Sequence, residues 1–307
     1  MEHPETMKIP AKNKKEKLAE LPELAPEDVE MRELFDAEYR AFSKESPDHP
    51  DRNEDSFFID ADSAIAGIFD GMGGHKAGNI ASEMAAGAIL EELKNAPEDM
   101  PAGDWEGYMK NAFLKASREI VDQIEKDPES FGNMGTTATA VKLLETPAGK
   151  KAVIGNAGDS RIYLFRNGKL SRITRDDTIV QEYIDRGAFK NDVDLDQKIT
   201  LNAGKGPKEY TFDELRHQIT QVLGVKESAH KEMEPRVQTI DVFPGDILML
   251  SSDGIHDNLD DEDIKNVLEE RGDFEQRLVQ KAAAIEKDKN NPRHKPDDKT
   301  TVIIKID

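Results

Sequence analysis

The stretch AIAGIFDGMGGH, residues 64–75, combines an apolar run with a carboxylate and a glycine-rich turn, and the rest of the chain repeats this arrangement. Residues 64–69 are short and apolar and are followed by turn residues, which predicts a buried strand. Asp70 then stands where the strand ends, and Gly71 lets the backbone approach a ligand closely. Because a side chain at a strand end is better positioned than one on a free loop, Asp70 is a candidate functional residue.

Other carboxylates stand at the ends of predicted strands in the same way. They are Glu54 and Asp55 before residues 57–59, Asp159 after residues 151–156, Asp253 after residues 247–250, and Asp297 before residues 300–306. In a chain with 63 acidic residues, some will end strands by chance, and Asp-Gly is also an ordinary turn sequence. The prediction of a site therefore rests on the joint set and not on any single acid.

Carboxylates gathered in one place repel one another unless cations lie between them. Ligands that are all oxygen atoms select hard ions, so we expect Mg²⁺ or Mn²⁺. Two such ions about 3.5–4 Å apart can lower the pKa of a bridging water and hold a phosphoryl oxygen at the same time. A two-metal site of this kind can hydrolyse a phosphoester without a covalent enzyme intermediate.

The chain as a whole alternates strand-like and helix-like segments, which predicts an α+β fold with largely antiparallel sheets. We expect helices at residues 27–41, 77–94, 105–125, 260–271 and 273–287. Further strands are expected at residues 136–144, 161–165 and 170–173, with a hairpin turn at Asn167-Gly168. Residues 176–240 are polar and irregular and predict an exposed excursion. Residues 1–30 carry four prolines and a lysine-rich run, so we expect a mobile tail before a domain at 31–307.

Composition narrows the class of protein. The 307 residues include 42 Lys+Arg and 63 Asp+Glu, and the net charge of −21 argues against a general binder of nucleic acid or anionic membranes. The absence of cysteine excludes disulfides, thiolate metal sites and a cysteine nucleophile. No run approaches the ~20 apolar residues of a membrane span, and the N-terminus has no apolar signal core. We therefore expect a soluble, cytoplasmic protein.

Six motifs taken together resemble the metal-dependent protein phosphatase family, also called protein phosphatase 2C or PPM. In chain order they are RNED at 52–55, DGMGGH at 70–75, MGTTA at 134–138, NAGDSR at 156–161, SDG at 252–254 and DDKT at 297–300. Each motif is weak evidence alone, and the resemblance rests on all six in the family's order. It implies a β-sandwich of two antiparallel sheets flanked by helix pairs, with metal ions in a cleft at one edge.

The resemblance also implies a serine/threonine protein phosphatase that acts on phosphorylated proteins, with two or three Mg²⁺ or Mn²⁺ ions. It assigns Asp70 to bridge two ions, with the Gly71 carbonyl completing the first, and Asp55 to orient metal-bound waters. Glu54, Asp253 and Asp297 would serve the second ion, while Asp159 and Asp257 match acids that hold a third, weaker ion in relatives.

Two positions depart from the family's pattern. Relatives of animal type have a histidine directly after the Asp-Gly pair, whereas this chain has Met72, as in the bacterial-type branch. The donor of the leaving-group proton is therefore unassigned. The family's phosphate-binding arginine usually stands where this chain has Pro50, so the role is carried over to Arg52, with Arg40 as a competitor.

These departures leave two alternatives open, namely an inactive member that binds a partner, and a phosphatase of small phosphoesters. The second is allowed by the excursion at 176–240, which corresponds to the family's flap and is longer than usual around residues 192–215. Among the histidines, His75 is expected to support a helix start, His217 to lie on the surface, and His256 to line the cleft wall.

Overall fold

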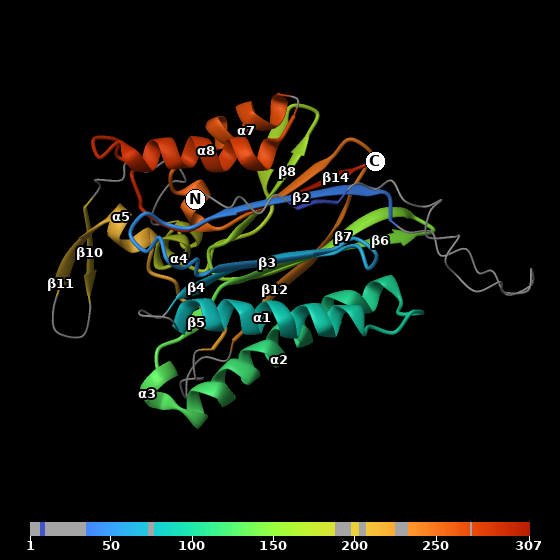
Figure 1. Cartoon of the computed structure of the whole chain (residues 1–307), viewed down its shortest axis with the longest axis horizontal. Coiled ribbons are helices and arrows are strands. Elements are labelled where there is room, and N and C mark those ends of the chain that lie inside the picture. Colours follow the sequence, from blue (N-terminus) through green and yellow to red (C-terminus); the bar gives the residue numbers. More distant parts are fainter. Residues whose placement is uncertain are drawn as a thin grey trace, which may run out of the picture.

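Two antiparallel sheets pack face to face, and a pair of helices covers each outer face (Figure 1). The computed structural model describes residues 7–9, 35–72, 77–187, 198–202, 207–224, 233–270 and 272–307. Helices α1 (Ala77–Lys94) and α2 (Trp105–Lys126) lie on one side, and α7 (Asp261–Glu269) and α8 (Phe274–Lys287) lie on the other. The expected α+β sandwich flanked by helix pairs is thereby confirmed.

The first sheet contains both ends of the described chain. Its strand order is β1 (Met7–Ile9), β2 (Ala37–Lys44), β14 (Lys299–Ile306), β13 (Ile247–Ser251), β8 (Arg161–Arg166) and β9 (Lys169–Arg172). The β8–β9 hairpin turns at Asn167 and Gly168, whose φ angles of 52° and 73° are the positive values that a two-residue turn of this kind requires. The turn predicted at these two residues is therefore confirmed.

The second sheet carries most of the predicted site motifs. Its strand order is β12 (Arg236–Asp241), β7 (Gly149–Ala157), β6 (Ala138–Thr146), β4 (Ile65–Met72) and β3 (Asp55–Asp60), and the short β5 (Gly135–Thr136) pairs with the end of β4. Strand β12 pairs with β7 along its whole length, although its residues fall mostly within the excursion expected at 176–240. Residues 236–240 thus belong to the sandwich.

Three apolar layers hold the sandwich together. Ile68 and Val141 of the second sheet pack against Leu248 and Val302 of the first, which forms the layer between the sheets. A second layer joins the outer face of the second sheet to α1 and α2, and a third joins the first sheet to α7 and α8. Burial of apolar surface in these layers is the main favourable term in folding, so the sheet edges that carry the candidate site rest on a rigid frame.

The helix expected at residues 27–41 is wrong for the part that the structure describes. Residues 37–41 begin β2, which pairs with β14 from Ala37↔Ile306 to Lys44↔Lys299. Ala37, Tyr39 and Ala41 are buried on one face of this strand. Pairing with a strand more than 250 residues away has overridden the local helical pattern. Residues 27–34 lie outside the described residues.

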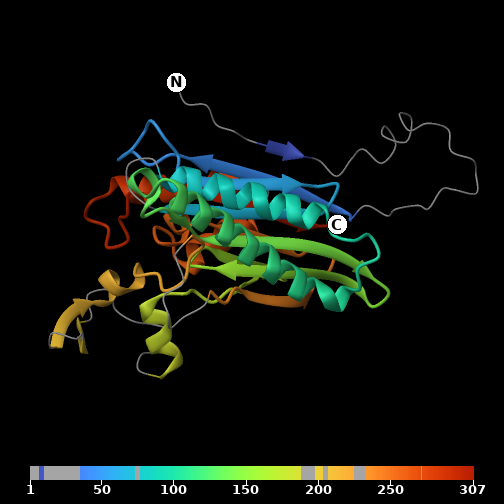
Figure 2. The same ribbon diagram turned by 90° about the horizontal axis from the view of Figure 1, so that it is seen from below.

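A small unit stands apart from both sheets and corresponds to the expected flap. It contains α4 (Ile179–Asp185), β10 (Lys198–Asn202), β11 (Pro207–Thr211) and α5 (Phe212–Arg216), with β10 paired to β11. Figures 1 and 2 show this unit projecting at one end of the sandwich. Val180 and Leu215 form its own apolar cluster, and an isolated bridge joins Thr178 to Ile219.

Three short elements complete the described fold: a 3₁₀ turn at Ala102–Asp104, α3 (Pro128–Phe131) and α6 (Asp253–His256). Of residues 1–30, only Met7–Ile9 are described, and they pair with Tyr39–Ala41. The tail and the domain boundary at residue 31 stay predictions. Among the helices that the structure describes, none has the length and apolarity needed to span a membrane.

Candidate metal centre

Carboxylates from distant parts of the chain meet where β3 begins and β4 ends. Asp55 and Asp70 are direct partners in the β3–β4 register. Burial raises the pKa of Asp70 well above its usual value, and the nearby charges of Asp253, Asp55, Asp297 and Asp159 raise it further. Five of the predicted site acids therefore lie close enough to repel one another. This agrees with the prediction that the acids at strand ends form a single site.

Two glycines make this convergence possible. A Cβ on Gly71 would lie 2.2 Å from the Gly78 carbonyl oxygen and 2.5 Å from that of Glu54. A Cβ on Gly254 would lie 1.9 Å from the Asp298 carbonyl oxygen. Any side chain at either position would push apart the backbone segments that carry the acids, so these glycines are required by close approach. Gly71 also donates its backbone N–H to the Glu54 carbonyl, at 3.1 Å.

The donor set fits divalent cations with oxygen ligands. Oδ1 of Asp55, Oδ1 of Asp159 and Oδ1 of Asp253 are buried and have no hydrogen-bond partner among the described residues. Burial raises the pKa of Asp159 and raises that of Asp253 to about 6, and neighbouring carboxylates add to the shift in each case. Buried oxygens without partners are costly, and a hard cation satisfies several at once.

Glu54 and Arg52 lie at the rim of this cluster as a pair. Arg52 Nε donates to Glu54 Oε1 at 3.1 Å, and the Arg52 side chain is 34% exposed. The backbone N–H of Glu54 donates to Asp298 Oδ2 at 2.6 Å. Asp298 is buried and also accepts from the Ser46 N–H, which ties the β2–β3 loop to the start of β14. Asp298 thus has a structural role, as an acceptor for two backbone N–H groups, that was not predicted from the sequence.

The competitor Arg40 is engaged elsewhere. Its guanidinium donates to Glu38 and, at 2.7 Å, to Asp273 Oδ1. Asp273 precedes the first residue of α8, whereas Glu286, which contacts the Asp297 backbone, lies near the end of that helix. Arg40 is therefore about a helix length from the cluster, and Arg52 is the better placed of the two arginines.

A lysine that the sequence reading did not single out lies among the predicted metal ligands. Lys295 Nζ is 3.0 Å from Asp257 Oδ2 and 3.1 Å from Asp297 Oδ2, and it also contacts Asp253 Oδ2. The only signal in the sequence is a lysine two residues before Asp297, and such a lysine is more often solvated at a surface. The three-dimensional structure was needed to find it.

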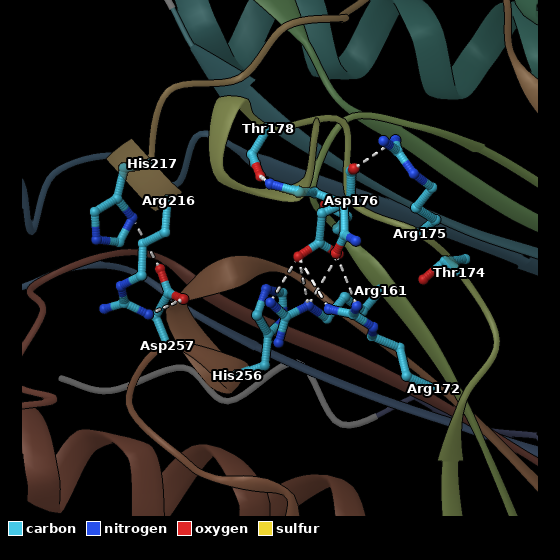
Figure 3. Close-up of polar contacts among 12 residues, drawn as sticks. Arg161, Arg172, Thr174, Arg175, Asp176, Thr178, Arg216, His217, His256 and Asp257 are labelled. Atoms are coloured by element: carbon cyan, nitrogen blue, oxygen red, sulfur yellow. Dashed lines mark hydrogen bonds and ion pairs between the residues drawn. The ribbon is translucent and has the colours of Figure 1, made fainter. Parts of the chain in front are cut away.

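Asp257 contacts Arg216 and His217 at the end of α5 in the flap, as Figure 3 shows. Arg216 Nη1 lies 2.7 Å from Asp257 Oδ1, and His217 Nδ1 lies 3.1 Å from Asp257 Oδ2. Burial disfavours the ionised carboxylate, but Lys295, His217 and Arg216 together hold the pKa of Asp257 well below its usual value. The His217 side chain is 30% exposed, so it lies partly at the surface as expected. It also faces the acids, because His217, Asp253 and Asp257 offer ligand atoms that all lie within 4.8 Å of one another.

A cavity of about 650 Å³ lies between the flap and the sandwich, beside the acids. Asp159, His256 and Asp257 line it from the body, and Phe212 and Arg216 line it from the flap. Arg161 and Arg172 both contact Asp176 on its wall (Figure 3). The expected place of His256 on the cleft wall is thus confirmed. His75 lies outside the described residues.

The model of the family described as protein phosphatase 2C matches residues 49–291, which is most of the chain. The chain belongs to the protein phosphatase 2C family. The matched region includes the five acids above except Asp297, which follows it by six residues. The resemblance predicted from the six motifs is therefore confirmed.

Several protein phosphatase 2C relatives are similar along much of the chain. The serine/threonine protein phosphatase PstP of Mycobacterium tuberculosis is 34% identical over 217 residues, which are 71% of this chain and 36% of PstP. This chain thus spans about a third of the length of that relative. The serine/threonine phosphatase stp of Listeria monocytogenes is 28% identical over 236 residues, which are 76% of this chain and 83% of that protein.

A solved structure adds a comparison of the fold and of the metal. It is the catalytic domain of PstP in complex with two manganese ions, and it superposes with a TM-score of 0.66 and 29% identity. The superposition covers 88% of this chain and 97% of that domain. The chain thus shares its fold with a domain that holds two manganese ions.

Proposed function

We propose that this chain is a metal-dependent phosphatase that hydrolyses phosphoserine and phosphothreonine esters in proteins. The observation that carries the proposal is the convergence of five partly or fully buried carboxylates near the start of β3 and the end of β4. Three of them have an oxygen without a hydrogen-bond partner among the described residues. Membership of the protein phosphatase 2C family supports it, as does the similarity to a PstP domain that holds two manganese ions.

In this proposal, two Mg²⁺ or Mn²⁺ ions are held by acids around the β3–β4 edge. When bound, two such ions lower the pKa of a water and neutralise the charge on phosphoryl oxygens. The residues that would hold the ions are Asp70, the Gly71 carbonyl, Glu54, Asp253 and Asp297, with Asp159 and Asp257 beside a third position.

Asp55 and Arg52 act on the water and on the phosphate. Ser252 Oγ donates to Asp55 Oδ2 at 2.8 Å, which fixes the carboxylate and leaves Oδ1 to accept a hydrogen bond that would orient a metal-bound water. Arg52 binds Glu54 through Nε, so both Nη groups stay available to donate to phosphoryl oxygens. The pair with Glu54 thereby orients the guanidinium.

Among the residues that the structure describes, neither Met72 nor His256 suits the role of donor of the leaving-group proton. Met72 has no acidic proton. Burial holds the pKa of His256 well below its usual value, so this imidazole is neutral near pH 7 and a poor acid. This gap favours a second candidate function, a catalytically inactive member that binds a partner. A phosphatase of small phosphoesters is the remaining alternative.

The test is hydrolysis of phosphoserine peptides, phosphothreonine peptides and a chromogenic phosphate ester by protein stripped with EDTA and then given Mn²⁺. We expect activity only after Mn²⁺ is restored, and faster turnover of the peptides than of small phosphate metabolites. Hydrolysis that persists in EDTA would contradict the metal-dependent mechanism. Binding of Mn²⁺ without hydrolysis of any substrate would favour the binding module. The cytoplasmic location and the lack of nucleic-acid or membrane partners stay predictions.

A further inference from the structure

Lys295 offers a positive charge at a place where the proposed function requires metal ions. Its ammonium contacts one carboxylate oxygen, Oδ2, of each of Asp253, Asp257 and Asp297. The Lys295 side chain is only 20% exposed. A surface lysine gains little from one exposed ion pair, whereas this ammonium faces three partly buried carboxylates at once.

The backbone holds Lys295 in this place. Its N–H donates to Asn258 Oδ1 at 3.1 Å, and its carbonyl accepts from Asn258 Nδ2 at 2.9 Å. Asn258 is fully buried and also donates to the Gly254 carbonyl, so it is fixed to α6. Pro296 follows directly and restricts φ at its own position. The lysine stem therefore starts from a rigid point next to the acids.

Lys295 Nζ occupies the position between Oδ2 of Asp253, Oδ2 of Asp257 and Oδ2 of Asp297. A divalent ion must approach carboxylate oxygens to about 2.0–2.6 Å, which is closer than the ammonium contacts with Asp257 and Asp297. An ion held between these three Oδ2 atoms would thus have to displace Lys295 Nζ. The other side of the cluster differs, because Oδ1 of Asp55, Oδ1 of Asp159 and Oδ1 of Asp253 have no partner among the described residues. An ion bound by these atoms need not displace the lysine.

We propose that Lys295 is a tethered cation that competes with a divalent ion for the position between Asp253, Asp257 and Asp297. This inference rests on the proposed metal-dependent function and adds a property of this chain to it. One ion of the set binds more weakly than it would without the lysine, and its binding requires exchange of an ammonium for a metal. The remaining positions, around Asp55 and Asp70, are not affected directly.

The experiment is calorimetric titration of Mn²⁺ into EDTA-stripped protein, with the Lys295→Met and Lys295→Arg variants. We expect Lys295→Met to bind one Mn²⁺ at least 10-fold more tightly than the wild type, or to gain one bound ion. Lys295→Arg keeps the charge and should stay within about threefold of the wild type. Lys289→Met removes an exposed lysine from the same loop and controls for the change in net charge.

Thermal melting provides a second measurement if Lys295→Met folds poorly without metal. Removing the ammonium leaves the carboxylates unneutralised, so the variant should melt at a lower temperature in EDTA and show a larger upward shift with Mn²⁺ than the wild type. Lys295→Gln, which keeps a polar contact without the charge, should behave in the same way.

The outcomes separate this inference from the proposed function. If Lys295→Met binds the wild-type number of ions with wild-type affinities, the competition is refuted while the metal site stands. A merely structural role would lower the melting temperature without changing the Mn²⁺ affinity, and this too refutes it. If neither protein binds Mn²⁺, the proposed function fails and the inference fails with it.

Discussion

Lys299 Nζ lies 2.5 Å from Glu286 Oε1 in the interior, where the two side chains are 1% and 4% exposed. The same ammonium donates to the Asp297 carbonyl at 2.6 Å, and the same carboxylate accepts from the Asp297 N–H at 3.2 Å. This buried pair therefore holds both backbone polar groups of Asp297. It connects α8, which supplies Glu286, to the strand end that presents a predicted metal ligand.

Breaking this pair should destabilise the fold strongly. Lys299→Met would leave the Glu286 charge buried and unpaired, which costs about 3–5 kcal/mol. Urea unfolding in EDTA measures the loss. Lys281→Met breaks the more exposed pair of Lys281 with Asp263 and should cost less than about 1 kcal/mol. Equal losses of unfolding free energy in the two variants would show that the buried pair contributes no more to stability than the exposed one.

Asp70→Asn should change stability and activity in opposite directions. The Asp70 side chain is half-buried and its carboxylate is repelled by Asp253 and Asp55, so removing its charge should raise the free energy of unfolding in EDTA. The same change should lower kcat by about 100-fold or more, the scale of losing one preorganised electrostatic group. Asp241→Asn, at a pair that is 61% exposed on the aspartate side, should alter neither quantity. Near-normal turnover of Asp70→Asn would remove Asp70 from the mechanism.

The two candidate arginines should separate in kinetics. Arg52→Ala removes the guanidinium beside the cluster and should lower kcat/KM for a chromogenic phosphate ester by about 10–100-fold, because a hydrogen bond between charged groups contributes about 1.5–3 kcal/mol. Arg40→Ala should leave kcat/KM unchanged and lower stability slightly, since its partners are Glu38 and Asp273. The reverse pattern would reassign phosphate binding to Arg40.

Lys142 should give the stability a distinctive dependence on alkaline pH. It lies 5.0 Å from the centre of the Trp105 ring, and its Nζ donates to the Ser63 carbonyl at 2.6 Å. Burial lowers its pKa to about 8, although Asp60 opposes the shift. The unfolded lysine has a pKa of about 10.4 and so binds more protons than the folded one between these two values. The free energy of unfolding should therefore rise with pH across this window.

Denaturant unfolding of the wild type and of Lys142→Met at several pH values tests this directly. Between pH 8 and 10, the free energy of unfolding of the wild type should rise relative to that of Lys142→Met by at most about 1.4 kcal/mol per pH unit. Below about pH 7 the difference should be constant, because Lys142 is then protonated in both the folded and the unfolded wild type. A constant difference across the whole range would mean that Lys142 keeps its ordinary pKa.

The local signals of the sequence determined the elements that depend on neighbours along the chain. Helix α1 begins and ends at the predicted residues, 77 and 94, because its periodicity and the following Pro97 act within a few turns. The Asn167-Gly168 turn is correct for the same reason, since its positive φ angles suit these two residue types. The acids at strand ends were found because the apolar runs before or after them are also local.

Only the tertiary structure decided what those acids contact. Residues 37–41 became a strand because β14 pairs with them, and Lys295 came to lie among three carboxylates because Asn258 holds its backbone. The same holds for His217, which reaches Asp257 from the flap. Such contacts depend on strand register and on packing between segments far apart in the chain. A sequence read one window at a time does not contain that information.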